Sequence, residues 1–306
     1  MKNPFSLKKI FKSRDIHSQY SHQHSPFIPS AFEAAVLKHI ICTNTATSVP
    51  NAQYPLLLGI QGPYGYGKTY MVKALCKKYN ILLTTLSSSD LSGEMEGDSK
   101  KNLQKEYEDM CIKIAKGQTC GALLIDDFHL TIATEDSIGK TVNSNLLASY
   151  LMNLCDNPDI SNTRVPIILT GNNYMRIYPA LVRDGRMDIF TWVPAHEDIA
   201  QMVSQIFYSK FNEIEESTIL MMLEEFSDMN IAFFEQVAQD LINSNLGQTL
   251  NAFKENKGKW SLTELSESVK NSLSSVELSE EHLMETCQKR KENMIYNFEK
   301  AEKNEI

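Results

Sequence analysis

The sequence contains no hydrophobic run that approaches the roughly 20 residues of a membrane-spanning helix. Its apolar segments, such as Tyr54–Ile60, have the length of a strand, so we expect no membrane partner. Positive charge is also scarce, because the net charge at pH 7 is -8. Phosphate backbones attract basic surfaces, and the sequence shows neither a recognisable helix-turn-helix nor a basic stripe. We therefore expect no nucleic-acid partner.

None of the six cysteines belongs to a CxxC pair. They stand singly inside apolar segments, a placement that is typical of buried, reduced thiols. The pattern favours a structural role for these residues and a reducing compartment.

Residues 1–25 differ in character from the rest of the chain. They carry five basic residues against one acid, are rich in Ser and His, and have no apolar core of signal-peptide length. We expect a mobile basic arm. A short organelle-targeting segment and a partner-docking arm are the alternatives.

Strand-like and helix-like segments alternate from residue 56 onward. Such alternation predicts an α/β fold with a parallel sheet and helices on both of its faces. The five predicted strands are Leu56–Ile60, Ile81–Leu86, Ala122–Ile125, Ile167–Thr170 and Ile189–Trp192.

The strands stop after Pro194, and the remaining periodic segments have helical spacing. A polar stretch, Asn251–Trp260, interrupts them, and the last helix is expected from about Glu280 to Ala301. We therefore predict an α/β subdomain over residues 26–193 and a smaller α-helical subdomain over residues 194–306.

A complete phosphate-binding motif, GxxxxGK[ST], follows the first predicted strand and opens a helix. Its glycines let backbone N–H groups turn toward phosphate oxygens, and the helix N-terminus adds partial positive charge. Lys68 would reach the β- and γ-phosphates, and the Thr69 hydroxyl would ligate Mg²⁺. The alternative is a chance match in a glycine-rich loop. The predicted ATP-binding residues are Gly62, Pro63, Tyr64, Gly65, Tyr66, Gly67, Lys68, Thr69 and Tyr70.

Two acids end the third predicted strand, where the carboxyl edge of the sheet meets the phosphates. Asp126 would hold Mg²⁺, directly or through water, and Asp127 would orient and polarise the attacking water. The alternative is a pair of acids that caps a helix.

The fourth predicted strand ends in Gly171 and Asn172, and the fifth is preceded by two arginines that flank an Asp-Gly turn. Asn172 could sense the γ-phosphate and help to fix the water; an ordinary Gly-Asn turn is the alternative. Arg183 and Arg186 could stabilise the charge of the transferring phosphoryl group when a neighbour supplies them. A surface ion pair is the alternative for these arginines.

These four elements together resemble the AAA+ ATPases, and further segments resemble Rubisco activases. The resemblance is firm from Pro26 to about Glu197. The segments that carry it include Phe27–Phe32, Thr141–Asn143, Leu151–Leu154 with Asp156–Pro158, Arg164–Asn172 and Leu181–Met187 with Trp192.

The resemblance implies a five-stranded AAA+ module with a helical lid, acting in a homo-oligomeric ring, typically a hexamer. Members of this family are ATP-driven motors that release inhibitory sugar phosphates from Rubisco. By this resemblance Arg183 and Arg186 are arginine fingers, Asn172 is the sensor, and the loops Ser88–Lys100 and Phe128–Lys140 face the central pore. The implied location is a cyanobacterial-type cytoplasm, with the plastid stroma as the alternative.

The sequence also departs from the family pattern. The second-sensor arginine would fall on Ala238, and no arginine occurs between Arg186 and Arg290. A shorter arm than in plant activases and the lack of a Rubisco small-subunit-like domain are further departures. The missing arginine and the shorter arm motivate a second hypothesis, an ATP-switched protein that assembles and clusters or localises a partner with little remodelling. A DNA-linked AAA+ protein is a third, disfavoured by the acidic charge balance.

Overall fold

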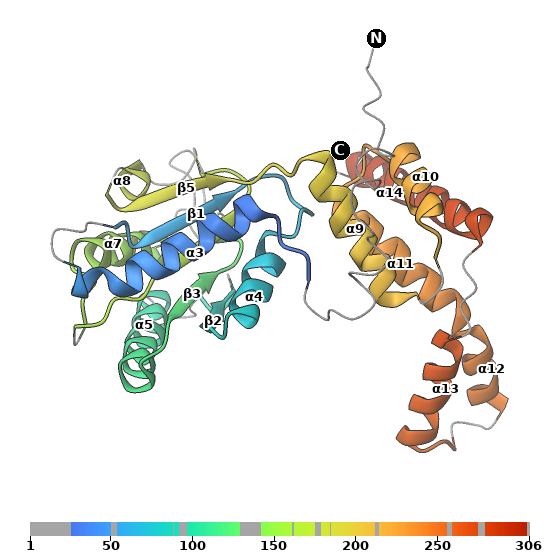
Figure 1. Ribbon diagram of the computed structural model, residues 1–306, viewed down its shortest axis with the longest axis horizontal. Coiled ribbons are helices and arrows are strands. Elements are labelled where there is room, and N and C mark those ends of the chain that lie inside the picture. The colour runs from blue at the N-terminus through green and yellow to red at the C-terminus, as the bar shows by residue number, and fades with distance from the viewer. Residues whose placement is uncertain are drawn as a thin grey trace, which may run out of the picture. The chain divides into compact units, whose positions relative to one another are not determined.

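Figure 1 shows the chain in a computed structural model, in which the residues form two compact units. One unit spans Ile28–Val193, and the other contains the chain from Pro194 onward together with Pro26 and Phe27. The predicted arm at residues 1–25 lies outside the described residues. The described ranges are 26–49, 54–87, 89–91, 97–128, 142–160, 162–174, 179–183, 185–211, 214–255, 259–274 and 279–304.

A parallel sheet of five strands forms the centre of the first unit, in the order β2-β3-β4-β1-β5. All of its pairings are parallel, which confirms the predicted α/β class. Strands β3 and β4 are buried along their whole length, as their unbroken apolar sequence requires. The strands are β1 (Leu57–Gln61), β2 (Leu82–Leu86), β3 (Gly121–Ile125), β4 (Ile167–Gly171) and β5 (Met187–Thr191).

Helices cover both faces of this sheet. Helices α5 (Asp98–Gly117) and α7 (Val142–Asp156) share one buried cluster with residues of β3 and β4, such as Ile125 and Leu169. Side chains alternate along a strand, so the neighbouring Leu124 and Ile168 point to the other face. Helices α3 (Ser30–Thr45) and α4 (Lys68–Lys78) lie there (Figure 1). A short 3-10 helix, η1 (Ala46–Ser48), and a short α8 (Pro179–Val182) complete the unit.

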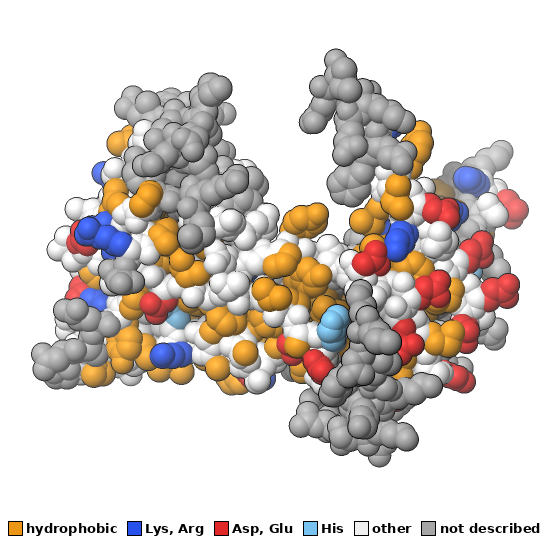
Figure 2. Space-filling model, turned by 90° about the horizontal axis from the view of Figure 1, so that it is seen from above, with side chains coloured by type: hydrophobic (Ala, Val, Ile, Leu, Met, Phe, Trp, Pro, Cys, Tyr) orange, Lys and Arg blue, Asp and Glu red, His pale blue; other side chains and the backbone are white. Residues whose placement is uncertain are grey.

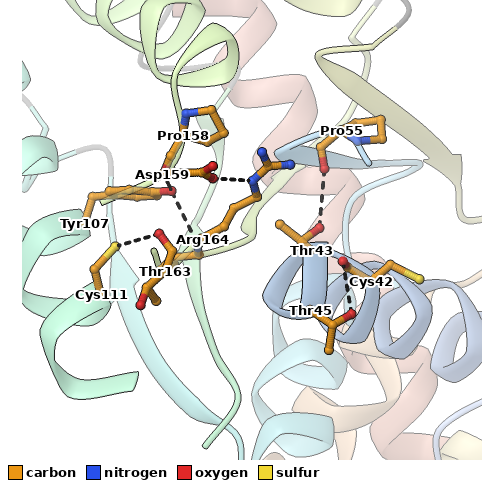
Figure 3. Close-up of polar contacts among 11 residues, drawn as sticks. Cys42, Thr43, Thr45, Pro55, Tyr107, Cys111, Pro158, Asp159, Thr163 and Arg164 are labelled. Atoms are coloured by element: carbon orange, nitrogen blue, oxygen red, sulfur yellow. Dashed lines mark hydrogen bonds and ion pairs between the residues drawn. The ribbon is translucent and has the colours of Figure 1, made fainter. Parts of the chain in front are cut away.

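The amino end of β4 is fixed by a buried tyrosine of α5 (Figure 3). The Tyr107 hydroxyl donates to the carbonyl oxygen of Pro158 at 2.7 Å and accepts from the backbone N–H of Val165 at 3.3 Å. Beside it, Arg164 Nε lies 2.9 Å from Asp159 Oδ1. These contacts hold the segment that leads into β4 at the edge of the sheet opposite its carboxyl ends.

The second unit is helical, and its core is built from side chains that include Phe207, Met222, Phe234 and Leu241. Its acidic side chains outnumber the basic ones, and they are spread over its surface in the view of Figure 2. Its helices are α9 (His196–Lys210), α10 (Glu216–Glu225), α11 (Ile231–Asn245), α12 (Gly247–Glu255), α13 (Leu262–Ser274) and α14 (Glu280–Asn304).

Helices α12 and α13 differ from the sequence-based expectation, because residues 251–255 of the predicted polar stretch are helical and α13 was not predicted. Helices α12 and α13 contact each other through few side chains, some of them polar. Phe253 packs edge-to-face on Trp260, and the buried Thr249 bonds to Ser272 at 2.7 Å. None of the described apolar side chains of these two helices is among the buried core residues.

All six cysteines are free, and three of them, Cys76, Cys111 and Cys287, are buried. Burial raises the pKa of each of these three thiols to about 12. In the described part of the chain, no helix combines the length and the apolar character needed to cross a bilayer.

Candidate nucleotide-binding site

The glycine-rich loop connects β1 to α4. Gly65 and Gly67 have φ values of 79° and 71°, a left-handed conformation that glycine adopts without steric cost. Gly67 precedes α4, and its carbonyl oxygen accepts the first helical hydrogen bond, from the N–H of Met71 at 2.8 Å. The motif therefore lies between a strand and a helix N-terminus, the context in which it binds phosphate.

Lys68 is buried within this loop, with 8% of its surface exposed. Its Nζ donates to the carbonyl oxygens of Gly62 and Pro63, both at 2.8 Å. Burial lowers the pKa of the Lys68 ammonium, while the charges of Asp127 and Asp126 act in the opposite direction. The loop thus holds a desolvated cation close to two carboxylates.

Three side chains from three elements meet beside Lys68. The Thr69 hydroxyl of α4 donates to Asp126 Oδ1 at 2.5 Å, and the Thr170 hydroxyl of β4 donates to the same oxygen at 2.6 Å. The two hydroxyl oxygens are 3.4 Å apart. They meet because the carboxyl ends of β1, β3 and β4 share one edge of the sheet.

Asp127 follows with a φ of 49° and an exposed side chain. Its N–H donates to Asp126 Oδ1 at 3.1 Å and to Thr170 Oγ1 at 3.2 Å. Thr170 is therefore a site residue that the sequence analysis did not identify. A polar residue at the end of an otherwise apolar buried strand was the available signal.

These oxygen donors fit a magnesium ion. Mg²⁺ is usually bound by one or two carboxylates together with substrate phosphates and waters. Thr69 and Asp126 supply a hydroxyl and a carboxylate of this kind. Among the described residues, no group of three or more His, Cys, Asp and Glu side chains is suited to a metal, so phosphates and waters would have to supply the remaining ligands.

Tyrosines occur within the phosphate loop and directly after it, and two of them are exposed. Tyr64 and Tyr70 expose 70% and 61% of their surfaces. The carbonyl oxygen of Tyr66 accepts a hydrogen bond from Trp192 Nε1 at 3.1 Å. Trp192 is itself buried and packs edge-to-face on Phe32. The hydrogen bond therefore connects the phosphate loop to this buried aromatic pair.

Asn172 directly follows β4 and is exposed. Because β4 lies between β3 and β1, Asn172 is at the same sheet edge as the two acids. Its predicted role as a sensor stays a prediction.

The two arginines lie at the opposite edge of the sheet. The carbonyl oxygen of Arg186 accepts from the N–H of Leu57, the first residue of β1, at 3.1 Å. The five residues of β1 span roughly 15 Å at 3.3 Å per residue. The arginines and the phosphate loop of one chain are therefore at opposite ends of β1.

Arg183 and Arg186 also differ from each other. Arg183 is exposed and forms no ion pair with the described residues. Arg186 forms a two-pronged contact with Asp156, at 3.1 Å from Nε and 2.7 Å from Nη2, and donates to the carbonyl oxygen of Ala180 at 2.9 Å. Such a fork fixes the orientation of the guanidinium.

The helical unit places Ala238 in the buried part of α11. Arg290 of α14 contacts the same helix, where its Nε donates to Asp240 Oδ2 at 2.6 Å. The arginine of this unit nearest in sequence to Ala238 is thus engaged by an acid of α11. The predicted pore-loop residues 92–96 and 129–140 lie outside the described residues.

Comparison with known proteins agrees with this architecture. Residues 58–195 match the family described as "ATPase family associated with various cellular activities (AAA)". Residues 58–195, which hold the phosphate loop together with Asp126, Asp127, Thr170 and Asn172, thus belong to this family of AAA ATPases.

Within the family, the chain is similar to proteins named ribulose bisphosphate carboxylase/oxygenase activase. It is 30% identical to the chloroplastic activase of Spinacia oleracea over 237 residues, covering 74% of this chain and 49% of the relative. It is 32% identical over 219 residues to activase 2 of Larrea tridentata and to the activase of Arabidopsis thaliana, covering 68% of this chain and 49% and 45% of those relatives. The chain thus spans about half the length of the curated relatives that it matches.

Proposed function

We propose that this chain binds ATP with Mg²⁺ on the loop Gly62–Thr69 and hydrolyses it. The observation that carries the proposal is the meeting of Lys68, Thr69, Asp126 and Asp127 at one edge of the sheet. Lys68 binds the β- and γ-phosphates, and Thr69 and Asp126 would hold the ion, which would neutralise charge on the transferring group. Asp127 orients the attacking water.

We propose further that the site is completed by a second copy of the chain, in a ring that is typically a hexamer. Arg183 is exposed at the sheet edge opposite its own phosphate loop, which supports a role on the nucleotide of a neighbouring copy. Arg186, held by Asp156, fixes the turn that presents Arg183. Asn172 acts as the sensor beside the γ-phosphate.

The similarity to activases supports a remodelling motor that acts on Rubisco. The motor would cause Rubisco to release an inhibitory sugar phosphate. The chloroplastic names of the relatives favour the plastid stroma, and a cyanobacterial-type cytoplasm is the alternative. Neither a membrane nor a nucleic acid is a proposed partner.

The first experiment measures Mg²⁺-dependent phosphate release from ATP. We expect turnover per subunit to rise with protein concentration and to fall at least about 100-fold in Lys68→Ala, because the phosphates lose their buried cation. Unchanged turnover in Lys68→Ala would refute the ATPase proposal.

The second experiment measures release of a bound sugar phosphate from inhibited Rubisco. We expect ATP-dependent release by the parent chain and none by Arg183→Ala. Turnover without release would remove Rubisco remodelling while leaving ATP hydrolysis in place.

A second candidate function is an ATP-switched assembly protein that clusters a partner with little remodelling. The observation that favours it is the buried Ala238 at the second-sensor position, with Arg290 engaged by Asp240. Slow turnover, unaffected by Rubisco and combined with ATP-dependent co-assembly, is the result expected for this candidate. Stimulated sugar-phosphate release would exclude it.

A further inference from the structure

Tyr174 lies beyond the end of β4, two residues after Asn172, and is completely buried. Its ring occupies space that two glycines leave open. A Cβ atom at Gly59 would lie 3.0 Å from Tyr174 Cε2, and one at Gly171 would lie 3.1 Å from its Cζ and its hydroxyl oxygen. The N–H of Tyr174 donates to Gln61 Oε1 at 3.0 Å. The ring is therefore held across β1 and β4 on the face that α5 and α7 cover.

The hydroxyl of Tyr174 is buried and has no hydrogen-bond partner among the described residues. An unsatisfied buried hydroxyl costs about 1 to 3 kcal/mol, and phenylalanine would fill the same space without that cost. Packing over the two glycines therefore accounts for the ring and not for the hydroxyl.

Two carboxylates act on this hydroxyl. Burial, then the charge of Asp127, then that of Asp126 raise the pKa of Tyr174 well above its ordinary value. The phenol therefore keeps its proton and has a hydrogen bond to donate. Geometry favours Asp127 as the acceptor, because its N–H lies 3.2 Å from Oγ1 of Thr170, the residue next to Gly171, against which the hydroxyl packs. Asp126 Oδ1 already accepts from two threonine hydroxyls.

We propose that Tyr174 is a positioning residue, whose hydroxyl donates a hydrogen bond to the Asp127 carboxylate and fixes it for its work on the attacking water. The backbone of Asp127 is already held by two hydrogen bonds, so rotation of its side chain is the movement required. This inference rests on the proposed ATP hydrolysis and on the role of Asp127 in it.

The test compares two matched tyrosine-to-phenylalanine variants. Tyr174→Phe is expected to lower kcat about tenfold with KM for ATP unchanged, because the lost contact acts on the chemical step. Its melting temperature should be equal to or above that of the parent, since an unsatisfied buried hydroxyl is removed. Tyr107→Phe loses two hydrogen bonds at the far end of the sheet, so it should lower the melting temperature and leave kcat unchanged.

A double-mutant cycle locates the partner. Residues that act together show non-additive effects, so Tyr174→Phe should cause no further loss of kcat in an Asp127→Ala background. A kcat of Tyr174→Phe within twofold of the parent, or a tenfold loss that persists in the Asp127→Ala background, would overturn the inference. If Lys68→Ala abolishes turnover while Tyr174→Phe does not change it, only this inference fails. If the ATP turnover of the parent chain does not depend on Lys68, both this inference and the proposed ATP hydrolysis are wrong.

Discussion

The hydroxyl of Thr170 connects several groups of the candidate site. It donates to the oxygen of Asp126 that also accepts from Thr69, and it accepts from the N–H of Asp127. It therefore links the strand that ends in the acids to the helix that follows the phosphate loop. Groups that orient metal ligands in this way affect metal affinity without touching the metal.

Replacing Thr170 by valine tests this role. The variant keeps the shape of the buried side chain but removes both hydrogen bonds. We expect the Mg²⁺ concentration for half-maximal ATPase activity to rise at least about tenfold, measured by titration of Mg²⁺ at saturating ATP. Thr170→Ser keeps the hydroxyl and should stay close to the parent; equal Mg²⁺ dependence in the valine variant would remove this role.

His39 on α3 is a second residue with a consequence of its own. Burial lowers its pKa from 6.5 to about 4, and a contact with the Leu56 backbone opposes the change only in part. Above pH 6.5 the ring is neutral in both states. As the pH falls from 6.5 toward 4, the unfolded chain takes up a proton that the folded chain does not, so the free energy of unfolding decreases.

We expect this one group to remove up to roughly 3 kcal/mol of stability across that window, at 1.36 kcal/mol per pKa unit. Urea unfolding of the parent between pH 7.5 and pH 5 measures the start of the decline. His39→Gln cannot titrate and should show a shallower dependence on pH. A slope identical to that of the parent would mean that His39 does not cause the decline.

At the scale of the elements, the phosphate loop is set by close packing as well as by its motif. Gly62 has its backbone against the end of β5, so a Cβ atom there would lie 2.1 Å from the carbonyl oxygen of Trp192. No side chain fits this position without moving a strand.

Gly62→Ala is therefore expected to destabilise the first unit by more than about 3 kcal/mol, a loss typical of substitutions that force backbone strain. Thermal unfolding followed by circular dichroism measures it. Gly97→Ala is the matched control, because Gly97 also has a positive φ but no atom lies within 4 Å of its Cβ position. The control should cost about 1 kcal/mol, and equal losses in both variants would contradict the packing argument.

The sequence predicted the sheet well because buried parallel strands are continuous apolar runs, and β3 and β4 are such runs. It predicted Lys68, Thr69, Asp126 and Asp127 because their spacing from strands is part of a motif. Thr170 and Tyr174 were missed because their contacts join neighbouring strands, which no local pattern encodes. Helices α12 and α13 were missed although both are amphipathic, because the polar composition of residues 251–260 indicates a loop.

At the scale of the whole molecule, the arginines and the phosphate loop of one chain are separated by the length of β1. In the proposed mechanism, Arg183 therefore acts on the nucleotide of a neighbouring chain.

Mixing two inactive variants tests completion by a neighbour. Lys68→Ala lacks the phosphate-binding cation, and Arg183→Ala lacks the group supplied to the next subunit. We expect each alone to be inactive and a mixture to regain part of the parent ATPase activity, because some interfaces pair an intact Lys68 with an intact Arg183. No recovery in a mixture that co-assembles would exclude a site shared in this way.

The Trp192 indole donates a hydrogen bond to the carbonyl oxygen of Tyr66, so its fluorescence can report on the phosphate loop. The protein has two tryptophans, and the other, Trp260, lies in the helical unit against Phe253. Indole emission responds to its hydrogen bonds, so ATP binding should shift or quench the fluorescence of Trp192. Trp260→Phe should keep this signal and Trp192→Phe should lose it, which would provide a label-free binding signal in which ATP affinity can be followed without turnover.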